Sequence, residues 1–254
     1  MASFIQIIKE IRVRSFKRFV HFSTSLPGFM CFAVDKSSFL FIYDEIFRKE
    51  IYKFETDTKT PFIIDCGANI GLLIPYVLKE YPQAEIIAFE PDPAIFEILK
   101  MNIASAGGET NTTPIQACLA KEAGEVTFYP DGADGGTMSY SDSTKKPITV
   151  QAVCLSDYIT KKVDFLKMDI EGAEYEVLTS IVPKLQLVER IFIEYHSFTS
   201  QTQRLDEILA QLNTAGFRYY IEHIGIRSDE PYIQRNVNHG MDMQINIYGY
   251  RQKK

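Results

Sequence analysis

The sequence predicts a doubly wound α/β fold, with a mostly parallel central sheet and an antiparallel hairpin at its carboxyl-terminal end. Two observations carry this prediction. From residue 61 onward, short apolar runs alternate with stretches of helical periodicity, which is the pattern of parallel strands joined by crossover helices. Residues 217–222 and 243–250 instead alternate between polar and apolar side chains, which is typical of half-buried antiparallel strands.

The elements of the main domain follow from local patterns. Pro93 marks the start of a helix, because its fixed φ and missing N–H suit the first turn. Strands are expected at 62–65, 85–89, 114–119, 163–169, 190–196, 217–222 and 243–250, with a hairpin-like stretch at 125–129 and a Gly-rich loop at 131–139. Helices are expected from the first Gly-rich turn to about residue 81, and at 93–103, 172–181 and 201–214.

We expect an amino-terminal helical cap or extension over residues 1–58 and one main domain over 59–254. Residues 1–20 have the pattern of a basic amphipathic helix, since apolar residues recur near helical spacing among several basic ones. Such a helix either packs as a cap or dimer contact, or lies on a membrane surface. Residues 37–55 indicate a strand followed by a mostly helical segment. The role of the extension, in ligand choice or in a homodimer, stays open.

Composition narrows the class of protein. Of the 254 residues, 46% are hydrophobic and 24% are charged, which excludes a disordered or fibrous chain. The formal net charge of −6 disfavours a nucleic-acid partner. No apolar run reaches the ~18 residues of a membrane span, and no signal-peptide hydrophobic region is found. The four cysteines, at positions 31, 66, 118 and 154, lack zinc-ligand spacing, and three of them lie in or at the end of apolar runs, where we predict buried thiols. We therefore expect a reducing, cytoplasmic compartment.

In a doubly wound sheet, ligands bind beyond the carboxyl ends of the strands. The first predicted strand ends in the glycine-rich turn DCGANIG, residues 65–71. Gly67 and Gly71 let the backbone bend sharply and approach a ligand closely. A dinucleotide fingerprint needs glycine at 69 and 72, where this chain has Asn69 and Leu72. The alternative for this turn is a tight strand–helix connection without a ligand.

Glu90 follows the second predicted strand. A carboxylate at that place accepts two hydrogen bonds from the diol of a ribose, which is a common way to hold an adenosine. The alternative is that Glu90 only complements the dipole of the following helix. Together, the glycine-rich turn and Glu90 indicate an adenosine-containing cofactor without a pyrophosphate clamp.

The stretch VDFLKMDIEGAE, residues 163–174, is the most specific pattern in the chain. Strand alternation places Phe165, Lys167 and Asp169 on one face. Because a lysine inside a strand is costly to bury alone, Lys167 should contact a carboxylate or a ligand. Glu171 and Glu174 fall in the first turn of the next helix, where the alternative is that they only oppose its dipole.

Glu194 and His196 lie two residues apart on the next predicted strand, so they share a face, while Ile193 and Tyr195 take the other. A histidine at a strand end, beside a carboxylate on the same face and opposite a second acidic cluster, is a candidate active-site group.

The segments FIIDCGANIG, AFEPDP, VDFLKMDIEGAEYEVL and IFIEYH, in this order and spacing, closely resemble the FkbM-type S-adenosylmethionine-dependent methyltransferases over roughly residues 47–250. The upstream segment EIFRKEIY also resembles the one that precedes the family's glycine loop. The resemblance implies a Rossmann-like class I methyltransferase fold and S-adenosyl-L-methionine as the cofactor. It also implies methyl transfer, usually to an oxygen of a sugar, a polyketide or another small hydroxylated molecule.

The resemblance also implies roles for single residues. It assigns the ribose to Glu90 and places Asp169 beside the transferred methyl group. It departs from many methyltransferases at residues 117–119, where Ala-Cys-Leu replaces an acid that contacts the adenine. The residues expected along the methionine part of the cofactor are Asp65, Gly67, Ala68, Asn69 and Gly71, and those expected around the acceptor are Glu171, Glu194 and His196.

An acceptor hydroxyl must lose its proton as it attacks a methyl group, so the reaction needs a base. We predict that His196, oriented by Glu194, is this base, with Asp169 as the competing candidate. His196→Ala should then keep cofactor binding and lose turnover. We predict no metal, although the acids around His196 offer ligands for a divalent cation that positions a diol.

Two interpretations from other classes stay open. One is a nicotinamide-dependent oxidoreductase, which the missing glycine at 69 disfavours, and the other is a non-catalytic binding protein with the same fold. A DNA amino-methylase is disfavoured because MDIEG stands where an Asp/Asn-Pro-Pro-Tyr/Phe motif is needed. A cap-type RNA methyltransferase is disfavoured because residues 172–181 contain no lysine. The identity of the acceptor is not determined.

Overall fold

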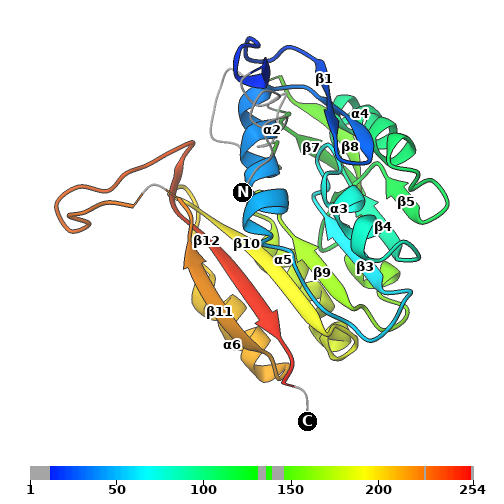
Figure 1. The fold of residues 1–254 in the computed structure, drawn as a ribbon. Coiled ribbons are helices and arrows are strands. Elements are labelled where there is room, and N and C mark those ends of the chain that lie inside the picture. Colours follow the sequence, from blue (N-terminus) through cyan, green and yellow to red (C-terminus); the bar gives the residue numbers. More distant parts are fainter. Residues whose placement is uncertain (1–11, 131–135, 139–145, 226, 253–254) are drawn as a thin grey trace.

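The structure is a computed structural model that describes residues 12–130, 136–138, 146–225 and 227–252. Its centre is a seven-stranded sheet with the order β11-β12-β10-β9-β3-β4-β5 (Figure 1). The strands β10, β9, β3, β4 and β5 run parallel, whereas β12 is antiparallel to both of its neighbours. The predicted fold class is therefore confirmed. The strands are β3 (Phe62–Cys66), β4 (Glu85–Phe89), β5 (Thr112–Ile115), β9 (Phe165–Met168), β10 (Arg190–Phe198), β11 (Arg218–His223) and β12 (Met241–Tyr250).

The strand order reverses between β3 and β9. From β3 the chain continues to β4 and β5 on one side, while β9 and β10 extend the sheet on the other side. The loops after β3 and β9 therefore leave the sheet in opposite directions, which opens a crevice at their carboxyl ends. This topology decides where a ligand site forms.

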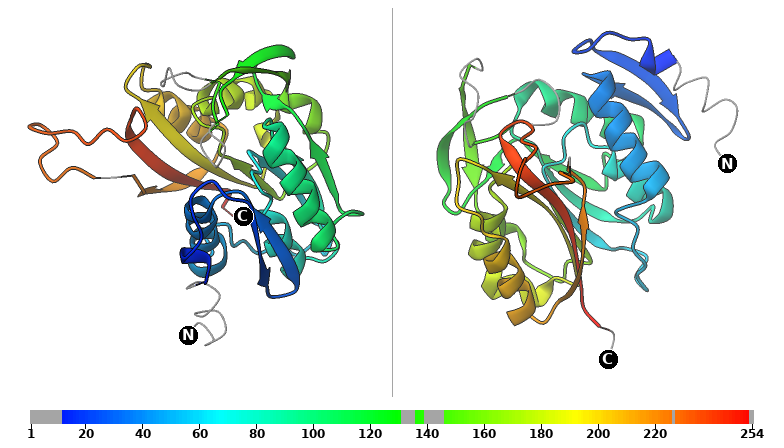
Figure 2. Two further views of the ribbon diagram at one scale, coloured as in Figure 1. Left: turned by 90° about the horizontal axis from the view of Figure 1, so that it is seen from above. Right: turned by 90° about the vertical axis from the view of Figure 1, so that its left-hand side faces the viewer.

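Helices cover both faces of the sheet (Figures 1 and 2). On one face, α3 (Leu73–Glu80) and α4 (Pro93–Ser105) pack with Ile63 and Phe165. On the other, α5 (Glu174–Ile181), α6 (Leu205–Thr214) and the 3-10 helices η2 (Leu155–Tyr158) and η3 (Val182–Leu187) surround residues such as Leu166. Neighbouring residues of one strand thus enter different cores, as strand alternation requires.

The amino-terminal extension differs from the helical cap that we expected. It forms a hairpin of β1 (Phe22–Leu26) and β2 (Phe29–Ala33), then α2 (Lys36–Tyr43) and the π-helical segment η1 (Asp44–Lys49). The strand expected at the start of 37–55 is wrong, because the Asp35 carboxylate accepts hydrogen bonds from the N–H groups of Ser37 and Ser38 and so begins a helix there. Residues 1–11 of the expected basic helix lie outside the described residues, and the homodimer stays a prediction.

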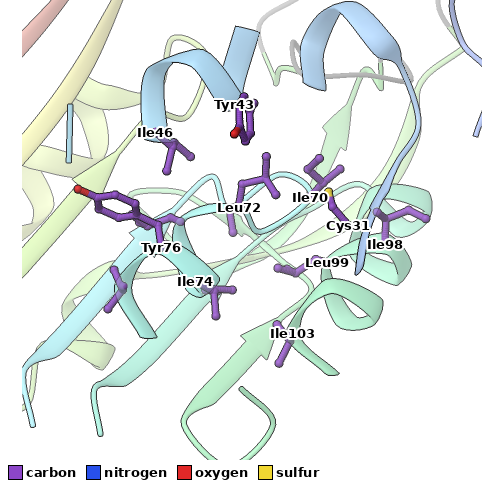
Figure 3. Close-up of a cluster of buried hydrophobic side chains, with 14 of the residues drawn as sticks. Cys31, Tyr43, Ile46, Ile70, Leu72, Ile74, Tyr76, Ile98, Leu99 and Ile103 are labelled. Atoms are coloured by element: carbon purple, nitrogen blue, oxygen red, sulfur yellow. The ribbon is translucent and has the colours of Figure 1, made fainter. Parts of the chain in front are cut away.

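The extension shares a hydrophobic core with the main domain (Figure 3). Tyr43 and Ile46 lie above Leu72 and Tyr76 of the first crossover. The Phe47 ring links the two parts, with centroids 5.2 Å from Tyr43 and 5.8 Å from Tyr76. Burial of these large side chains fixes α2 and η1 over the main domain.

A second, three-stranded sheet with the order β6-β8-β7 lies beside the main one. The prediction of a single strand over 114–119 is wrong. The chain turns after Ile115, because the N–H of Ala117 bonds to the Ile115 carbonyl at 3.1 Å. The turn separates β5 from β6 (Cys118–Leu119), which pairs with β8 (Ile148–Val153). The hairpin-like stretch is β7 (Gly124–Phe128), and most of the Gly-rich loop at 131–139 lies outside the described residues. Among the described helices, none is both long and apolar enough to span a membrane.

Asn102 ties the amino-terminal hairpin to the main domain. Its fully buried side chain accepts from the N–H of Phe32 at 2.8 Å and donates to the carbonyls of Phe32 and Ile70 at 2.9 and 2.7 Å. Asn102→Ala should lower the free energy of unfolding by about 2–4 kcal/mol, because it leaves buried backbone groups unpaired. Denaturant unfolding measures this loss. Met101→Ala, at the exposed neighbour on α4, is the control and should stay within about 0.5 kcal/mol of wild type.

Candidate active site

One pocket lies at the carboxyl ends of β3, β4, β9 and β10, where the strand order reverses. Residues from six parts of the chain line it. The glycine-rich turn supplies Asp65, Gly67, Ala68 and Asn69, the turn after β4 supplies Glu90, and the β9 region supplies Lys167, Asp169 and Glu171. The paired strands β10 and β12 add Glu194 and Gln244, the small sheet region adds Leu119, Phe128 and Met138, and the amino-terminal extension adds Phe41, Ile42, Glu45 and Tyr52.

The glycine-rich turn is held tightly between β4 and β9. The N–H groups of Gly67 and Ala68 both bond to the Phe89 carbonyl, at 3.2 and 2.7 Å. Gly67 has a φ of +85°, and a Cβ there would lie 1.8 Å from the Asp169 carbonyl oxygen. Only glycine fits this position, so the predicted close backbone approach is confirmed.

Glu90 lies at the predicted place and is almost fully buried beside the pocket. Its two oxygens accept from the N–H groups of Asn69 and Asp92, at 2.9 and 2.8 Å. Each carboxylate oxygen has further lone-pair capacity, so both can still accept a hydroxyl from a ligand. Burial raises the pKa of Glu90 to about 8, although the two N–H donors favour the charged form.

Lys167 contacts carboxylates, as the sequence predicted. Its Nζ lies 3.3 Å from Asp65 and 3.2 Å from Asp169, and it donates to the Gly67 carbonyl at 2.7 Å. Asp65 and Lys167 are register partners on β3 and β9, which explains their contact across the sheet. Burial alone would lower the pKa of Lys167, but the two carboxylates outweigh it and hold the pKa above its usual value.

His196 lies behind the pocket wall, and its ring is 1% exposed. Its Nδ1 is 2.9 Å from Glu174, and its Nε2 is 3.4 Å from Glu194 and 3.6 Å from Glu171. Burial would lower the pKa of His196, but Glu171 and Glu174 raise it well above the usual value, so the ring holds a proton near neutral pH. The predicted neighbourhood of Glu194 and His196 is present, but His196 itself is not among the described residues that line the pocket.

Glu174 does more than oppose the helix dipole. It also accepts from the N–H of Gly172 at 2.9 Å, so it fixes the turn after β9 as well as the His196 ring. Glu171 in that turn has a left-handed φ of +52°, which is strained for a residue with a Cβ. Asp169, Glu171 and His196 each offer a ligand atom within 4.8 Å of the others. The absence of a metal stays a prediction.

Sequence reasoning missed several pocket residues. Glu45 and Tyr52 come from the extension, and Gln244 comes from β12, where it donates to Glu194 at 2.5 Å. Phe128 and Met138 are two further apolar residues that line the pocket. Residues 117–119, where the sequence did not determine the adenine contact, line it as well. Glu45 belongs to the segment EIFRKEIY, which resembles the one that precedes the family's glycine loop, but the sequence pattern did not predict that its side chain lines the pocket.

Comparison with known proteins identifies the family. Residues 65–219, more than half of the chain, match the family described as "Methyltransferase FkbM domain". The chain belongs to this FkbM methyltransferase family. It is therefore a methyltransferase, and the resemblance seen in the motifs is confirmed.

Two relatives of this methyltransferase each match well over half of the chain. It is 30% identical over 199 residues to Methyltransferase sdnD of Sordaria araneosa, with 64% of this chain and 77% of that protein covered. It is 27% identical over 222 residues to the 31-O-demethyl-FK506 methyltransferase FkbM of Streptomyces tacrolimicus, with 72% of this chain and 83% of that protein covered.

Solved structures agree with the fold. A Methyltransferase FkbM from Methylobacillus flagellatus KT matches with a TM-score of 0.52 at 17% identity, over 80% of this chain and 46% of that chain. The M. jannaschii TYW2 structure in complex with AdoMet matches with a TM-score of 0.50 at 15% identity, over 93% of this chain and 89% of that chain. At these identities the likeness shows the fold alone, which is that of the class I methyltransferases.

The Lys167 ion pairs predict a stability effect that depends on pH. Lys167→Met should lower the free energy of unfolding by about 3–5 kcal/mol near neutral pH, because it leaves Asp65 and Asp169 buried without a cation. Both carboxyls then have folded-state pKa values above the unfolded value near ~4, so the loss is small at acid pH and grows as the pH rises. Denaturant unfolding at several pH values measures this. Lys162→Met, which removes only an exposed pair with Glu189, is the control and should show neither effect.

Proposed function

We propose that this methyltransferase uses S-adenosyl-L-methionine to methylate a hydroxyl of a small, hydroxylated molecule such as a sugar or a polyketide. One observation carries the proposal. A single pocket joins the Gly67 turn and the Glu90 carboxyl to a cluster of acidic residues at the ends of β9 and β10. The Gly67 turn and Glu90 would bind the adenosine part of the cofactor, and the acidic cluster would surround the methyl group and the acceptor hydroxyl.

The residues present fit the cofactor. The Glu90 carboxyl would accept the ribose diol, since its oxygens retain lone pairs on the pocket side. Leu119, Phe128 and Met138 would pack around the adenine without an acidic contact. The turn from Asp65 to Gly71 would hold the methionine part. When bound, S-adenosyl-L-methionine supplies a methyl group on a positively charged sulfur.

The charge of the pocket supports a neutral hydroxylated acceptor. Asp169, Glu171 and Glu194 line the pocket, and this negative charge disfavours an anionic acceptor. Carboxylates accept hydrogen bonds from hydroxyl groups, so a diol or polyol finds partners there. The relative from Streptomyces tacrolimicus is, by its name, a methyltransferase of 31-O-demethyl-FK506.

The geometry favours a positioning role for His196 over the role of base that we predicted from the sequence. A base must be unprotonated and within reach of the acceptor. His196 is buried behind Glu171 and Glu194 and is held in the protonated form by carboxylates. In this proposal the imidazolium orients those two carboxylates, while Asp169 is fixed by Lys167. Its positive charge also keeps Glu194 ionised, because burial alone would raise the pKa of Glu194 whereas His196 lowers it below the usual value.

Glu90→Ala tests the cofactor site. We expect isothermal titration to show micromolar binding of S-adenosylmethionine and S-adenosylhomocysteine by the wild-type protein, and at least a thirtyfold loss (roughly 2 kcal/mol) in the variant, because the diol loses both acceptors. Glu85→Ala, at the exposed start of the same strand, removes only a surface contact with Lys161 and is the control. Wild-type protein that binds NAD and neither sulfur compound would refute the proposal.

A further inference from the structure

Glu45 is a buried acid in the wall of the pocket, on a part of the chain outside the parallel sheet. It lies on η1 and is 6% exposed, and it lines the pocket together with Asp169, Glu194 and Gln244. A carboxyl so deeply buried costs free energy unless a partner or a function compensates it. Its position among the other acidic residues of the pocket, Asp169, Glu171 and Glu194, therefore requires an explanation.

The backbone at Glu45 is irregular in a way that holds the side chain there. The segment η1 is π-helical, and it ends at Glu50, whose φ of +52° is left-handed. The N–H of Ile51 bonds to the Glu45 carbonyl at 3.2 Å and closes the wide turn. The next side chain, Ile46, is buried against the main domain (Figure 3). Short π-helical segments are frequent at functional sites, because they re-aim single side chains.

The other carboxyls in this part of the pocket each have a cationic partner. Asp169 has Lys167 at 3.2 Å, and Glu171 has the His196 ring at 3.6 Å. Glu194 has the same ring at 3.4 Å and also accepts from Gln244. Within the described residues, the Glu45 carboxyl makes no hydrogen bond or ion pair. It is therefore the carboxyl with the least compensation for its charge, and the best placed to take up a proton.

Burial raises the pKa of Glu45 to about 8, and the negative charges of Glu194 and Asp169 add to this effect. Burial raises the pKa of Glu171 to about 8 as well, even though the neighbouring His196 lowers it, so Glu45 differs from Glu171 by its lack of a charged partner and not by its pKa. The groups that act on Glu45 come from every element around it. They are Glu194 on β10, Asp169 after β9, Tyr248 on β12, Tyr52 after η1, and Asp44 and Lys49 on η1 itself.

We propose that Glu45 is the base that takes the proton of the acceptor hydroxyl. This inference rests on the proposed function. As the hydroxyl oxygen forms its bond to the methyl carbon, the carbon–sulfur bond breaks and its electron pair stays on sulfur. The hydroxyl proton passes to the Glu45 carboxylate, which becomes a neutral carboxyl and returns the proton to solvent after the product leaves. The step is a substitution without oxidation or reduction, so it needs no further reactant.

Proton release on cofactor binding tests this assignment without an acceptor. The positive sulfur of S-adenosylmethionine favours the ionised form of a nearby carboxyl, whereas neutral S-adenosylhomocysteine does not. Isothermal titration at about pH 7.5 in buffers of different ionisation enthalpy counts the protons released. We expect wild-type protein to release roughly half a proton more with S-adenosylmethionine than with S-adenosylhomocysteine. Glu45→Gln should remove most of that difference and leave affinity for S-adenosylhomocysteine within about threefold.

Matched variants separate the possible outcomes. Glu97→Gln, at an exposed glutamate of α4 whose ion pair is with Lys100, should release protons as the wild type does. Glu45→Asp keeps a carboxyl and should retain part of the release. If Glu45→Gln leaves the difference in proton release between the two sulfur compounds unchanged, the role of Glu45 is overturned and the proposed function is not. Wild-type protein that binds neither sulfur compound overturns the proposed function as well.

A kinetic measurement completes the test once the wild type methylates a hydroxylated acceptor. Glu45→Gln should lower kcat by about 100-fold or more. In the wild type, kcat should rise with pH as Glu45 loses its proton, at a pH below about 8 because the positive sulfur favours the carboxylate in the complex, and the variant should lack this rise. A loss below about tenfold, with the pH profile unchanged, contradicts the assignment.

Discussion

The buried cation of Lys167 is the interaction on which the site depends. It joins β9 to β3 by contacts with Asp65 and Asp169, and its third bond holds the Gly67 carbonyl in the glycine-rich turn. Burying a charge is costly, and the cost is met here because carboxylates on both sides attract it. The same contacts oppose the rise that burial causes in the pKa of both carboxyls. The geometry of the turn and the charge of the pocket thus share one cause.

The pocket combines apolar and acidic side chains, and segments outside the parallel sheet supply some of each. The small sheet region contributes apolar Phe128 and Met138. The extension contributes Glu45, which the charges of Glu194 and Asp169 reach. The parallel sheet determines where the crevice lies, and the amino-terminal extension and the small sheet region contribute further side chains to its walls.

Backbone strain gathers around the same pocket. Asn69, Glu50 and Glu171 all have a left-handed φ, although none is glycine. Asn69 and Glu171 line the pocket, and Glu50 ends the turn that carries Glu45. Such conformations persist only where the surrounding contacts fix them, and here those contacts include Glu90, Glu174 and the packing of Ile46.

The sequence by itself determined the parallel sheet, the glycine-rich turn, the place of Glu90 and the need of Lys167 for a carboxylate. Local sequence patterns predict these features, because the periodicity of apolar residues and the residue types at strand ends depend only on neighbouring positions in the chain. Only the tertiary structure placed Glu45 and Gln244 in the pocket and His196 behind its wall. It also split residues 114–119 between two sheets and made α2 a helix. Contacts between distant segments decide burial and charge pairing, and those two quantities set which group holds a proton.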